Sequence, residues 1–344
     1  MPFDDGTADF RSDTVTRPTV AMRKAMASAI VGDDAYRDDP TVMELEQHVA
    51  ELTALEAALF VPSGTMANQL AVLVHTSPGD EILAHEHSHV RNLQAGAAQA
   101  LSGVAFRTVP SEDGAIGVAD VERAMAGAGR LPPISMLLWE NTHNLCGGRV
   151  VPIEVMEEAS AAARRGGCGV HLDGARIFNA VAHSGVPLHR YAATSDTLQF
   201  CFSKGLGAPI GSIVCGTQDH VDEMRYLRRR LGGGMRQAGV IAAAARVALD
   251  ERSRLHEDHE LARYLSHGLA ERFEDSTDPD STETNIVQAD AAAISSDWGP
   301  LVAQLDDRGL RVSPPSADIW RLVTHRDLDE VDVDRLLQAL GEGS

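Results

Sequence analysis

The sequence is poor in aromatic residues and has no excess of positive charge. Its 344 residues include only 3 Trp, 4 Tyr and 8 Phe, so the core must be built mainly from Ala, Val, Leu and Ile. Acidic residues number 50 against 30 basic ones, which gives a formal net charge of -20 at pH 7. This charge argues against nucleic-acid binding, which relies on basic surfaces, and favours a cytoplasmic protein.

Cysteines are also few, and long hydrophobic runs are missing. The cysteines are Cys146, Cys168, Cys201 and Cys215. No pair forms C-x-x-C or a zinc spacing, so we expect reduced thiols in a reducing compartment. The longest apolar run with helical character, residues 238–249, is too short to span a bilayer. Because the N-terminus is acidic where a signal peptide is basic, we expect no membrane segment or signal peptide.

One lysine follows an apolar stretch and precedes a turn of small residues. Lys204 comes after residues 200–203, and glycines 205, 207 and 211 follow it. The pattern predicts a lysine at the end of a buried strand. Desolvation favours the neutral amine, which can form a Schiff base with an aldehyde cofactor. Without a second signal, a surface lysine beside a glycine-rich turn would be the usual interpretation.

The second signal is an aspartate at the end of another predicted strand. Asp173 closes the strand of residues 169–173 and precedes small residues. At the carboxyl end of a strand in an open α/β sheet, a side chain points into the ligand crevice. A carboxylate there can pair with the pyridine nitrogen of pyridoxal 5'-phosphate (PLP) and keep the ring an electron sink. Asp173 and Lys204 together predict PLP as the cofactor.

A strand, a small-residue turn and a helix start follow one another between residues 57 and 75. The first N–H groups of a helix are unpaired and its dipole favours negative charge, so such a start can hold a phosphate. Gly64 and Thr65 stand at this point and are the candidates for the cofactor phosphate. An ordinary strand–helix connection with a Ser or Thr cap is the alternative.

Histidines cluster after the predicted strand of residues 81–84. His85, His87 and His89 alternate, which on a strand would place them on one face and suit a metal ion. With PLP predicted nearby, we expect no metal, and one imidazole stacks on the pyridine ring and moves protons. A loop position without a ligand role is the alternative for His85 and His87.

Predicted strands and helices alternate up to about residue 216. This alternation predicts an α/β protein with a mostly parallel central sheet flanked by helices. His143 follows the predicted strand of residues 134–139 and so falls in the same crevice.

The last quarter of the chain is predicted to form a separate unit. A long helix is predicted from residue 237 to about 273, and a polar loop at 275–284 leads to further strands and helices. We therefore expect an N-terminal arm (1–19), a large PLP-binding domain (20–250) and a small α+β C-terminal domain (251–344).

Two arginine segments are candidate anion ligands. The basic residues of 226–231 precede a glycine triplet, and Arg236 follows it. They could reach a phosphate or carboxylate, including one in a neighbouring subunit, although a solvated charge run is the commoner meaning. Arg321 lies in a predicted strand, where its planar fork could bind a substrate carboxylate. An exposed strand arginine is the alternative.

Several segments form a recognisable set: Arg11–Pro18, Asp34–Tyr36, Asp39–Val42, Gly64–Asn68, Glu140–Asn144, His171–Arg176, Ser203–Gly207 and Gly232–Gln237. Together they resemble the low-specificity L-threonine aldolases, which are fold-type-I PLP enzymes of the β-eliminating lyase group. The resemblance covers residues 10–324. It implies the PLP-dependent transferase-like fold and retro-aldol cleavage of L-threonine and L-allo-threonine to glycine and acetaldehyde. It also implies a homo-oligomer, usually a tetramer, with active sites shared across a dimer interface.

The resemblance further implies roles for individual residues. Lys204 would carry the Schiff base, Asp173 would meet the pyridine nitrogen, Gly64 and Thr65 would bind phosphate, and Arg236 would reach over from the other subunit. His89 would stack on the cofactor ring, and His89 or His143 would take the proton of the β-hydroxyl. Arg176 would contact the O3 region of the cofactor or the substrate carboxylate. The residues expected to bind substrate are Ser12, Tyr36, His143, Arg176 and Arg321.

The sequence departs from the family pattern at three positions. Gln94 replaces a glutamate, Arg37 a glycine after the loop tyrosine, and Arg229 a lysine before the glycine triplet. Gln94 removes a negative charge near the expected site, and Arg37 adds bulk and positive charge to a loop expected to face the substrate. Arg229 keeps the charge but not its shape. We expect altered substrate choice or a weaker reaction rather than loss of the cofactor.

The same residues permit other outcomes. If the Cα–H bond rather than Cα–Cβ is aligned with the cofactor's π-system, elimination results. A β-eliminating lyase, or an aldolase for a bulkier β-hydroxy amino acid, is therefore the alternative. A protein that binds PLP without turnover is a third possibility, for which Gln94 is the hint.

Overall fold

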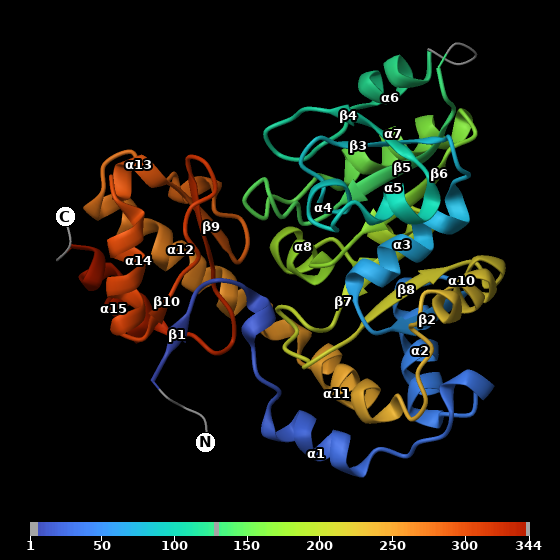
Figure 1. Cartoon of the computed structure of the whole chain (residues 1–344), viewed down its shortest axis with the longest axis horizontal. Helices are drawn as coiled ribbons and strands as arrows, with labels where there is room; N and C mark the ends of the chain where they lie inside the picture. Colours follow the sequence, from blue (N-terminus) through green and yellow to red (C-terminus); the bar gives the residue numbers. More distant parts are fainter. Residues whose placement is uncertain (1–5, 127–130, 342–344) are drawn as a thin grey trace.

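A seven-stranded sheet forms the centre of the larger part of the molecule (Figure 1). The computed structural model describes residues 6–126 and 131–341. The strand order is β2-β8-β7-β6-β5-β3-β4. Their bounds are β2 (Ala57–Val61), β3 (Glu81–His85), β4 (Ala105–Val109), β5 (Ile134–Glu140), β6 (Gly169–Asp173), β7 (Thr197–Cys201) and β8 (Ser212–Gly216). β8 alone runs opposite to the other six strands of this sheet, so the predicted mostly parallel sheet is confirmed.

Helices cover both faces of the sheet because its strands are apolar on both sides. Along β2, Leu59 and Val61 pack with α3 (Gly64–His75) and α10 (Gln218–Arg230), while Ala58 and Phe60 join the opposite core. The helices that contribute to that opposite core include α2 (Pro40–Thr53), α7 (Ile153–Arg165), α8 (Ile177–Ser184), α9 (Leu188–Ala193) and α11 (Gly239–Asp250). Within the described residues, no helix is both long enough and apolar enough to cross a bilayer.

A second hydrophobic core is built from the C-terminal part of the chain. Strands β9 (Ile286–Asp290) and β11 (Ile319–Val323) pair antiparallel. Among the described residues, four helices pack there: α12 (Leu255–Arg272), α13 (Ala291–Ile294), α14 (Trp298–Asp307) and α15 (Glu330–Gly341). Figure 1 shows this part in orange and red beside the large sheet. The expected boundary at residue 250 stays a prediction.

The start of the chain belongs to this second core. Strand β1 (Ala8–Asp9) pairs in parallel with β10 (Leu310–Arg311), and Phe10 is fully buried. The expected N-terminal arm is therefore anchored at residues 8–10, and its residues 1–5 lie outside the described part of the chain.

The prediction of one long helix over residues 237–273 is wrong in one respect. The short 3-10 turn Arg252–Arg254 divides it into α11 and α12. Leu249 of α11 is buried in the large core, whereas Leu261 of α12 is buried in the second core. The interruption therefore lies where the chain passes from the large core to the second core.

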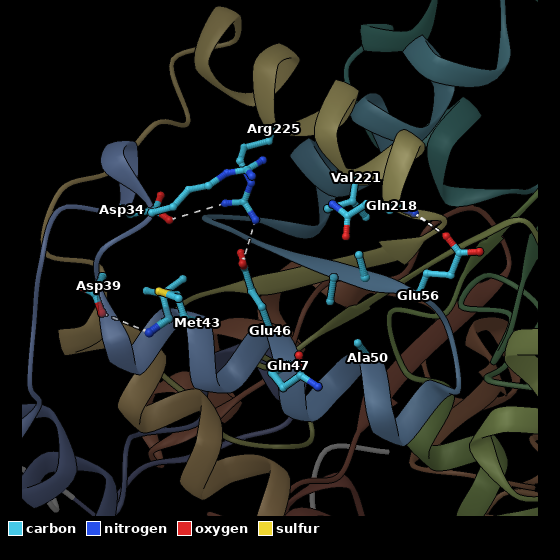
Figure 2. A pocket seen from close by; sticks show the side chains of 14 residues that line it. Asp34, Asp39, Met43, Glu46, Gln47, Ala50, Glu56, Gln218, Val221 and Arg225 are labelled. Carbon is cyan, nitrogen blue, oxygen red and sulfur yellow. Dashed lines mark hydrogen bonds and ion pairs between the residues drawn. The ribbon is translucent and has the colours of Figure 1, made fainter.

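Arg37 lies at the outer surface rather than at the carboxyl ends of the strands. Its side chain pairs with Asp222 of α10 and lines a cavity of about 220 Å³ between α2 and α10. In this cavity Arg225 donates to Glu46 at 2.8 Å (Figure 2). Within one chain, Arg37 therefore does not face the cavity that holds Lys204.

The backbone of Arg37 explains why a glycine would fit there. Its φ angle is +59°, in the left-handed region, which costs a residue with a Cβ about 1–2 kcal/mol. Both Arg37→Gly and Arg37→Ala remove the exposed ion pair, so their comparison isolates the backbone. We expect the glycine variant to be more stable than the alanine variant by about 1 kcal/mol in urea unfolding. A less stable glycine variant would contradict this account.

Candidate functional site

Polar side chains gather where the carboxyl ends of neighbouring strands meet. Asp173 is the last residue of β6, Glu140 of β5 and His85 of β3, and Lys204 lies shortly after β7. These strands are adjacent in the order β7-β6-β5-β3. Parallel strands present their carboxyl ends at one edge, which is where open α/β sheets bind ligands.

A cavity of about 170 Å³ opens at this edge of the sheet. Its lining includes five residues expected from the sequence: Gly64, Thr65, His89, Asp173 and Lys204. Lys204 is partly buried there. The cavity thus brings together a candidate nucleophilic amine, a carboxylate and the start of α3.

The carboxylate of Asp173 is buried and held on both oxygens. Oδ1 accepts hydrogen bonds from the Gln199 side chain and from the Ala175 N–H, and Oδ2 accepts one from Asn68 at 2.8 Å. Burial works to raise the pKa of Asp173, but His89 and Lys204 lead the groups that lower it, and the net shift is downward. This carboxylate stays ionised and correctly oriented for a cationic ring nitrogen.

The start of α3 approaches β7 closely because residue 64 is a glycine. A Cβ at Gly64 would lie 2.6 Å from the Sγ of Cys201. The N-cap Ser63 accepts a hydrogen bond from the Met66 N–H, and both Ser63 and Thr65 line the cavity. The first N–H groups of α3 thus open towards a site suited to a phosphate.

Two arginines converge on one asparagine beside this cavity. Arg176 and Arg321 donate to the Oδ1 of Asn144 at 3.1 and 2.9 Å. Arg176 also forms a buried ion pair with Asp13 at 2.7 Å. In the described part of the chain no carboxylate pairs with Arg321, and its Nε is buried without a partner. Arg321 is therefore available to an anion.

The electrostatics of Asp13 connect these arginines with Lys204. Burial works to raise the pKa of Asp13, but Arg176, Lys204 and Arg321 lower it, and the net shift is downward. Burial and the nearby charge of Arg176 lower the pKa of Arg321 to about 10. The guanidinium groups of Arg176 and Arg321 thus face a single carboxylate, Asp13, and this excess of positive charge suits a substrate carboxylate.

His89 is positioned by two polar neighbours. It begins the short helix α4 (His89–Asn92), where its N–H donates to Glu140 at 2.6 Å. Its Nδ1 lies 3.2 Å from the Nε2 of Gln94, whose Oε1 accepts from Gln69 at 2.7 Å. Gln94 thus contacts the histidine that lines the cavity, so this departure from the family pattern acts directly on the site.

The three alternating histidines are not on one face of a strand. His85 ends β3 and is buried, His87 lies in a turn with an exposed side chain, and His89 starts α4. The chain turns between them, so the strand-face geometry considered from the sequence is wrong.

His143 is buried behind the cavity rather than in its lining. Its ring has no exposed surface, and its Nε2 lies 4.0 Å from Glu140. Burial lowers the pKa of His143 to about 4. Glu140 lies between the two histidines, because it also accepts the hydrogen bond from the His89 N–H.

Three further expected residues lie outside the cavity lining. Ser12 caps the turn that carries Asp13 and accepts a hydrogen bond from the Thr14 N–H. Tyr36 is 79% exposed. Arg236 is exposed and lies 3.6 Å from Asp33. One chain does not bring Tyr36 and Arg236 to Lys204.

Comparison with known proteins agrees with this arrangement. Residues 9–292 match the family model for β-eliminating lyases. The chain belongs to the β-eliminating lyase family. An Arabidopsis thaliana relative named "Probable low-specificity L-threonine aldolase 2" is 42% identical over 339 residues, 96% of this chain and 95% of that protein. The low specificity L-threonine aldolase of Escherichia coli K12 is 37% identical over 330 residues, 93% and 94% of the two chains.

A solved structure confirms the fold of this β-eliminating lyase family member. The threonine aldolase of Leishmania major superposes with a TM-score of 0.80 at 20% identity, and the match covers 97% of this chain and 98% of that one. The likeness concerns the fold. With the sequence relatives, it confirms the fold-type-I arrangement and the resemblance found from the sequence motifs.

In this member of the β-eliminating lyase family, a hydrogen-bonded chain behind Asp173 was missed by sequence reasoning. Asn68, which holds Asp173, contacts the Nε2 of His171 at 3.0 Å, and His171 contacts the Thr197 hydroxyl at 2.9 Å. Thr197 also meets the Nε2 of His75 at 2.9 Å. No local pattern signals these contacts, because their partners are 26, 103 and 122 positions apart.

This chain of contacts makes the fold sensitive to acid. Burial lowers the pKa of His171 to about 4, below its ordinary 6.5, so the unfolded chain binds the proton first. The stability linked to His171 is complete above pH 6.5 and is lost as the pH falls from 6.5 to about 4, at about 1.4 kcal/mol per pH unit. We expect urea unfolding of His171→Gln to show a pH slope smaller by this amount in that range. Equal slopes in the two proteins would contradict the assignment.

Proposed function

We propose that the protein cleaves L-threonine, L-allo-threonine or related β-hydroxy-α-amino acids to glycine and an aldehyde, with PLP as its cofactor. The observation that carries this proposal is that Lys204 and the buried carboxylate of Asp173 line the same cavity. The names of the two relatives, which match nearly the whole chain, support the choice of reaction.

The residues of the cavity fit PLP. Gly64 and Thr65 at the start of α3 would hold the phosphate, Asp173 the pyridine nitrogen, and Lys204 the aldehyde carbon. The absence of a Cβ at Gly64 is what lets the backbone of α3 approach. When bound, PLP supplies an electron sink that stabilises negative charge at the substrate Cα.

Arg321 and Arg176 would hold the substrate carboxylate. Asn144 keeps both guanidinium groups in place, and Arg321 lacks an acidic partner in the described residues. A carboxylate fixed in this way would orient the Cα–Cβ bond for cleavage. Ser12, the N-cap of the turn that begins at Asp13, would help to hold the same carboxylate.

His89 is our candidate for the group that takes the β-hydroxyl proton. It lines the cavity, and Gln94 and Glu140 fix its position. His143 lies behind Glu140, so we assign it a supporting role through that carboxylate in place of direct proton transfer.

We further propose a homo-oligomer with active sites completed by a neighbouring subunit. The exposure of Tyr36 and Arg236 in one chain supports this, because each is expected at the site yet lies outside the cavity lining. The acidic composition and the free cysteines support a cytoplasmic location.

The lysines offer a direct test, since the chain has only two, Lys24 and Lys204. The protein with PLP is reduced with borohydride, digested and analysed by mass spectrometry. We expect the cofactor on the Lys204 peptide alone. Lys204→Ala should lose aldehyde release from L-threonine, whereas Lys24→Ala, which changes an exposed lysine of α1 (Val20–Ser28), should retain it. Retained cleavage by Lys204→Ala would refute the proposal.

Product analysis separates aldol cleavage from the elimination that the family name also allows. Cleavage of L-threonine yields glycine and acetaldehyde in equal amounts, whereas elimination yields a keto acid and ammonia. L-serine and phenylserine extend the comparison to smaller and bulkier side chains. Keto acid and ammonia as the main products would favour the β-eliminating lyase.

Arg321 should contribute strongly to substrate recognition. Losing one partner of a buried charge pair costs about 2–5 kcal/mol, so kcat/KM of Arg321→Gln should fall by at least about 30-fold. Arg311→Gln, which changes an exposed arginine of β10 paired with Asp306, is the matched control and should change little. Equal kcat/KM values for the two variants would show that Arg321 does not bind the carboxylate.

A further inference from the structure

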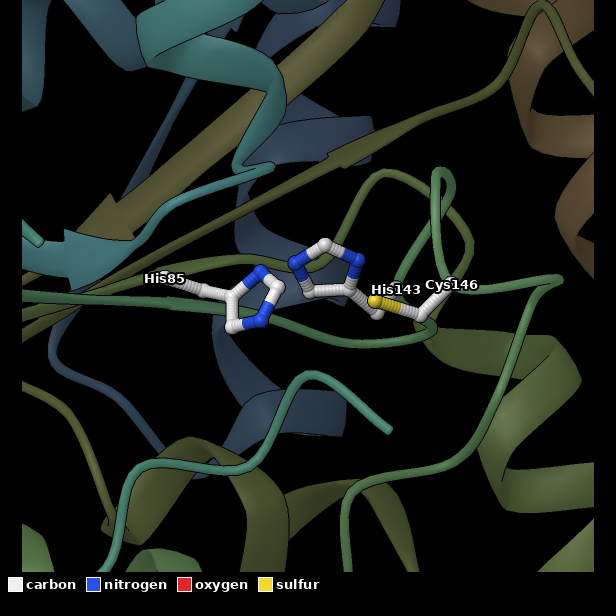
Figure 3. Close-up of side chains that lie close together, drawn as sticks. All are labelled: His85, His143 and Cys146. Carbon is white, nitrogen blue, oxygen red and sulfur yellow. The ribbon is translucent and has the colours of Figure 1, made fainter. Parts of the chain in front are cut away.

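A second chemical cluster lies at the same edge of the sheet, two strands away from Asp173. His85 at the end of β3 and His143 after β5 have ring centroids 4.6 Å apart. The thiol of Cys146 lies beside them, and one ligand atom from each of the three residues falls within 4.8 Å of the others. Figure 3 shows the two rings and the sulfur turned towards one another.

The orphaned ring of His143 is the most informative feature of this cluster. Its side chain has no exposed surface, and neither Nδ1 nor Nε2 has a hydrogen-bond partner. A buried polar group without a partner costs about 1–3 kcal/mol. Gly114 packs against the ring so closely that a Cβ there would lie 2.5 Å from its Cδ2. The fold thus encloses an imidazole and leaves both of its nitrogens unused.

His85 is held in the way that metal-binding histidines often are. Its Nε2 faces the Ser111 backbone, 2.9 Å from the carbonyl oxygen and 3.0 Å from the nitrogen. Its Nδ1 accepts from the His87 N–H at 3.1 Å, which places the proton of a neutral ring on Nε2, facing that carbonyl. Coordination through Nδ1 would replace the second contact and keep the first. A ring N–H donated to a backbone carbonyl is a frequent way of orienting a ligand histidine.

We propose that His85, His143 and Cys146 bind a divalent transition-metal ion, with Zn²⁺ as the best match. Two imidazoles and one thiolate are ligands that Zn²⁺ prefers, and a water molecule can complete the tetrahedron. In such a site the ligand atoms stand about 3.5 Å apart, given Zn–N and Zn–S bonds of about 2.1 and 2.3 Å. From separations of at most 4.8 Å, small side-chain rotations close the site.

The surroundings of Cys146 suit a cation that enters from outside. Cys146 is partly exposed and lines a second cavity of about 230 Å³. Three carboxylates, those of Glu140, Asp113 and Glu86, and one guanidinium group, that of Arg149, act electrostatically on its thiol. Because the carboxylates outnumber the guanidinium group, the local charge favours a metal ion at this position, and the cavity beside Cys146 is distinct from the one that Lys204 lines.

The test is a Zn²⁺ titration of untagged, PLP-loaded protein, stripped of metal with a chelator and kept under thiol reductant. A chromogenic chelator competes for the ion. We expect wild-type protein to take up one tight equivalent per chain, and Cys146→Ser and His85→Gln each to lose it. Co²⁺ in place of Zn²⁺ should give tetrahedral ligand-field bands in the wild type and not in Cys146→Ser.

Matched controls separate this site from adventitious binding. Cys168→Ser changes another free thiol, which donates to the Ile134 carbonyl, and His267→Gln changes an exposed histidine. Both should keep the equivalent. No tight equivalent in the wild type would overturn the proposal, as would either Cys146→Ser or His85→Gln binding Zn²⁺ as tightly as wild type. Circular dichroism establishes that the variants are folded.

Discussion

The site depends on a negative charge kept in a place that water does not reach. Asp173 is 1% exposed, and a lone buried carboxylate would become neutral. His89 and Lys204 nearby, together with hydrogen bonds from Asn68 and Gln199, favour its ionised form and lower its pKa. The strand order makes this possible, because β6, which ends at Asp173, lies between β7 and β5.

The proposed cofactor site and the proposed metal site lie at the same edge of the sheet. Glu140 lies between them, because it accepts from the His89 N–H on one side and stands 4.0 Å from His143 on the other. Its pKa is raised by burial and by the charge of Asp173. A proposed cofactor site and a proposed metal site can therefore share one wall without sharing a ligand.

Much of this arrangement could be predicted from local sequence. The alternation of short apolar strands with helices predicts the parallel sheet. Asp173 is found because it ends a strand, and Lys204 because it lies in the turn after β7. The contacts that make these residues work could not be predicted in this way. Asn68 is 105 positions from Asp173, and Asn144 is 177 positions from Arg321. The break between α11 and α12 likewise depends on two cores that exist only in three dimensions.

The protonation of the cofactor ring tests the central claim most directly. The ¹⁵N chemical shift of the pyridine nitrogen in bound, isotope-labelled PLP reports whether that nitrogen carries a proton. A protonated nitrogen at neutral pH in the wild type, and an unprotonated one in Asp173→Asn, is the result that this account predicts. A nitrogen that is unprotonated in the wild type, or that does not change in Asp173→Asn, would contradict it.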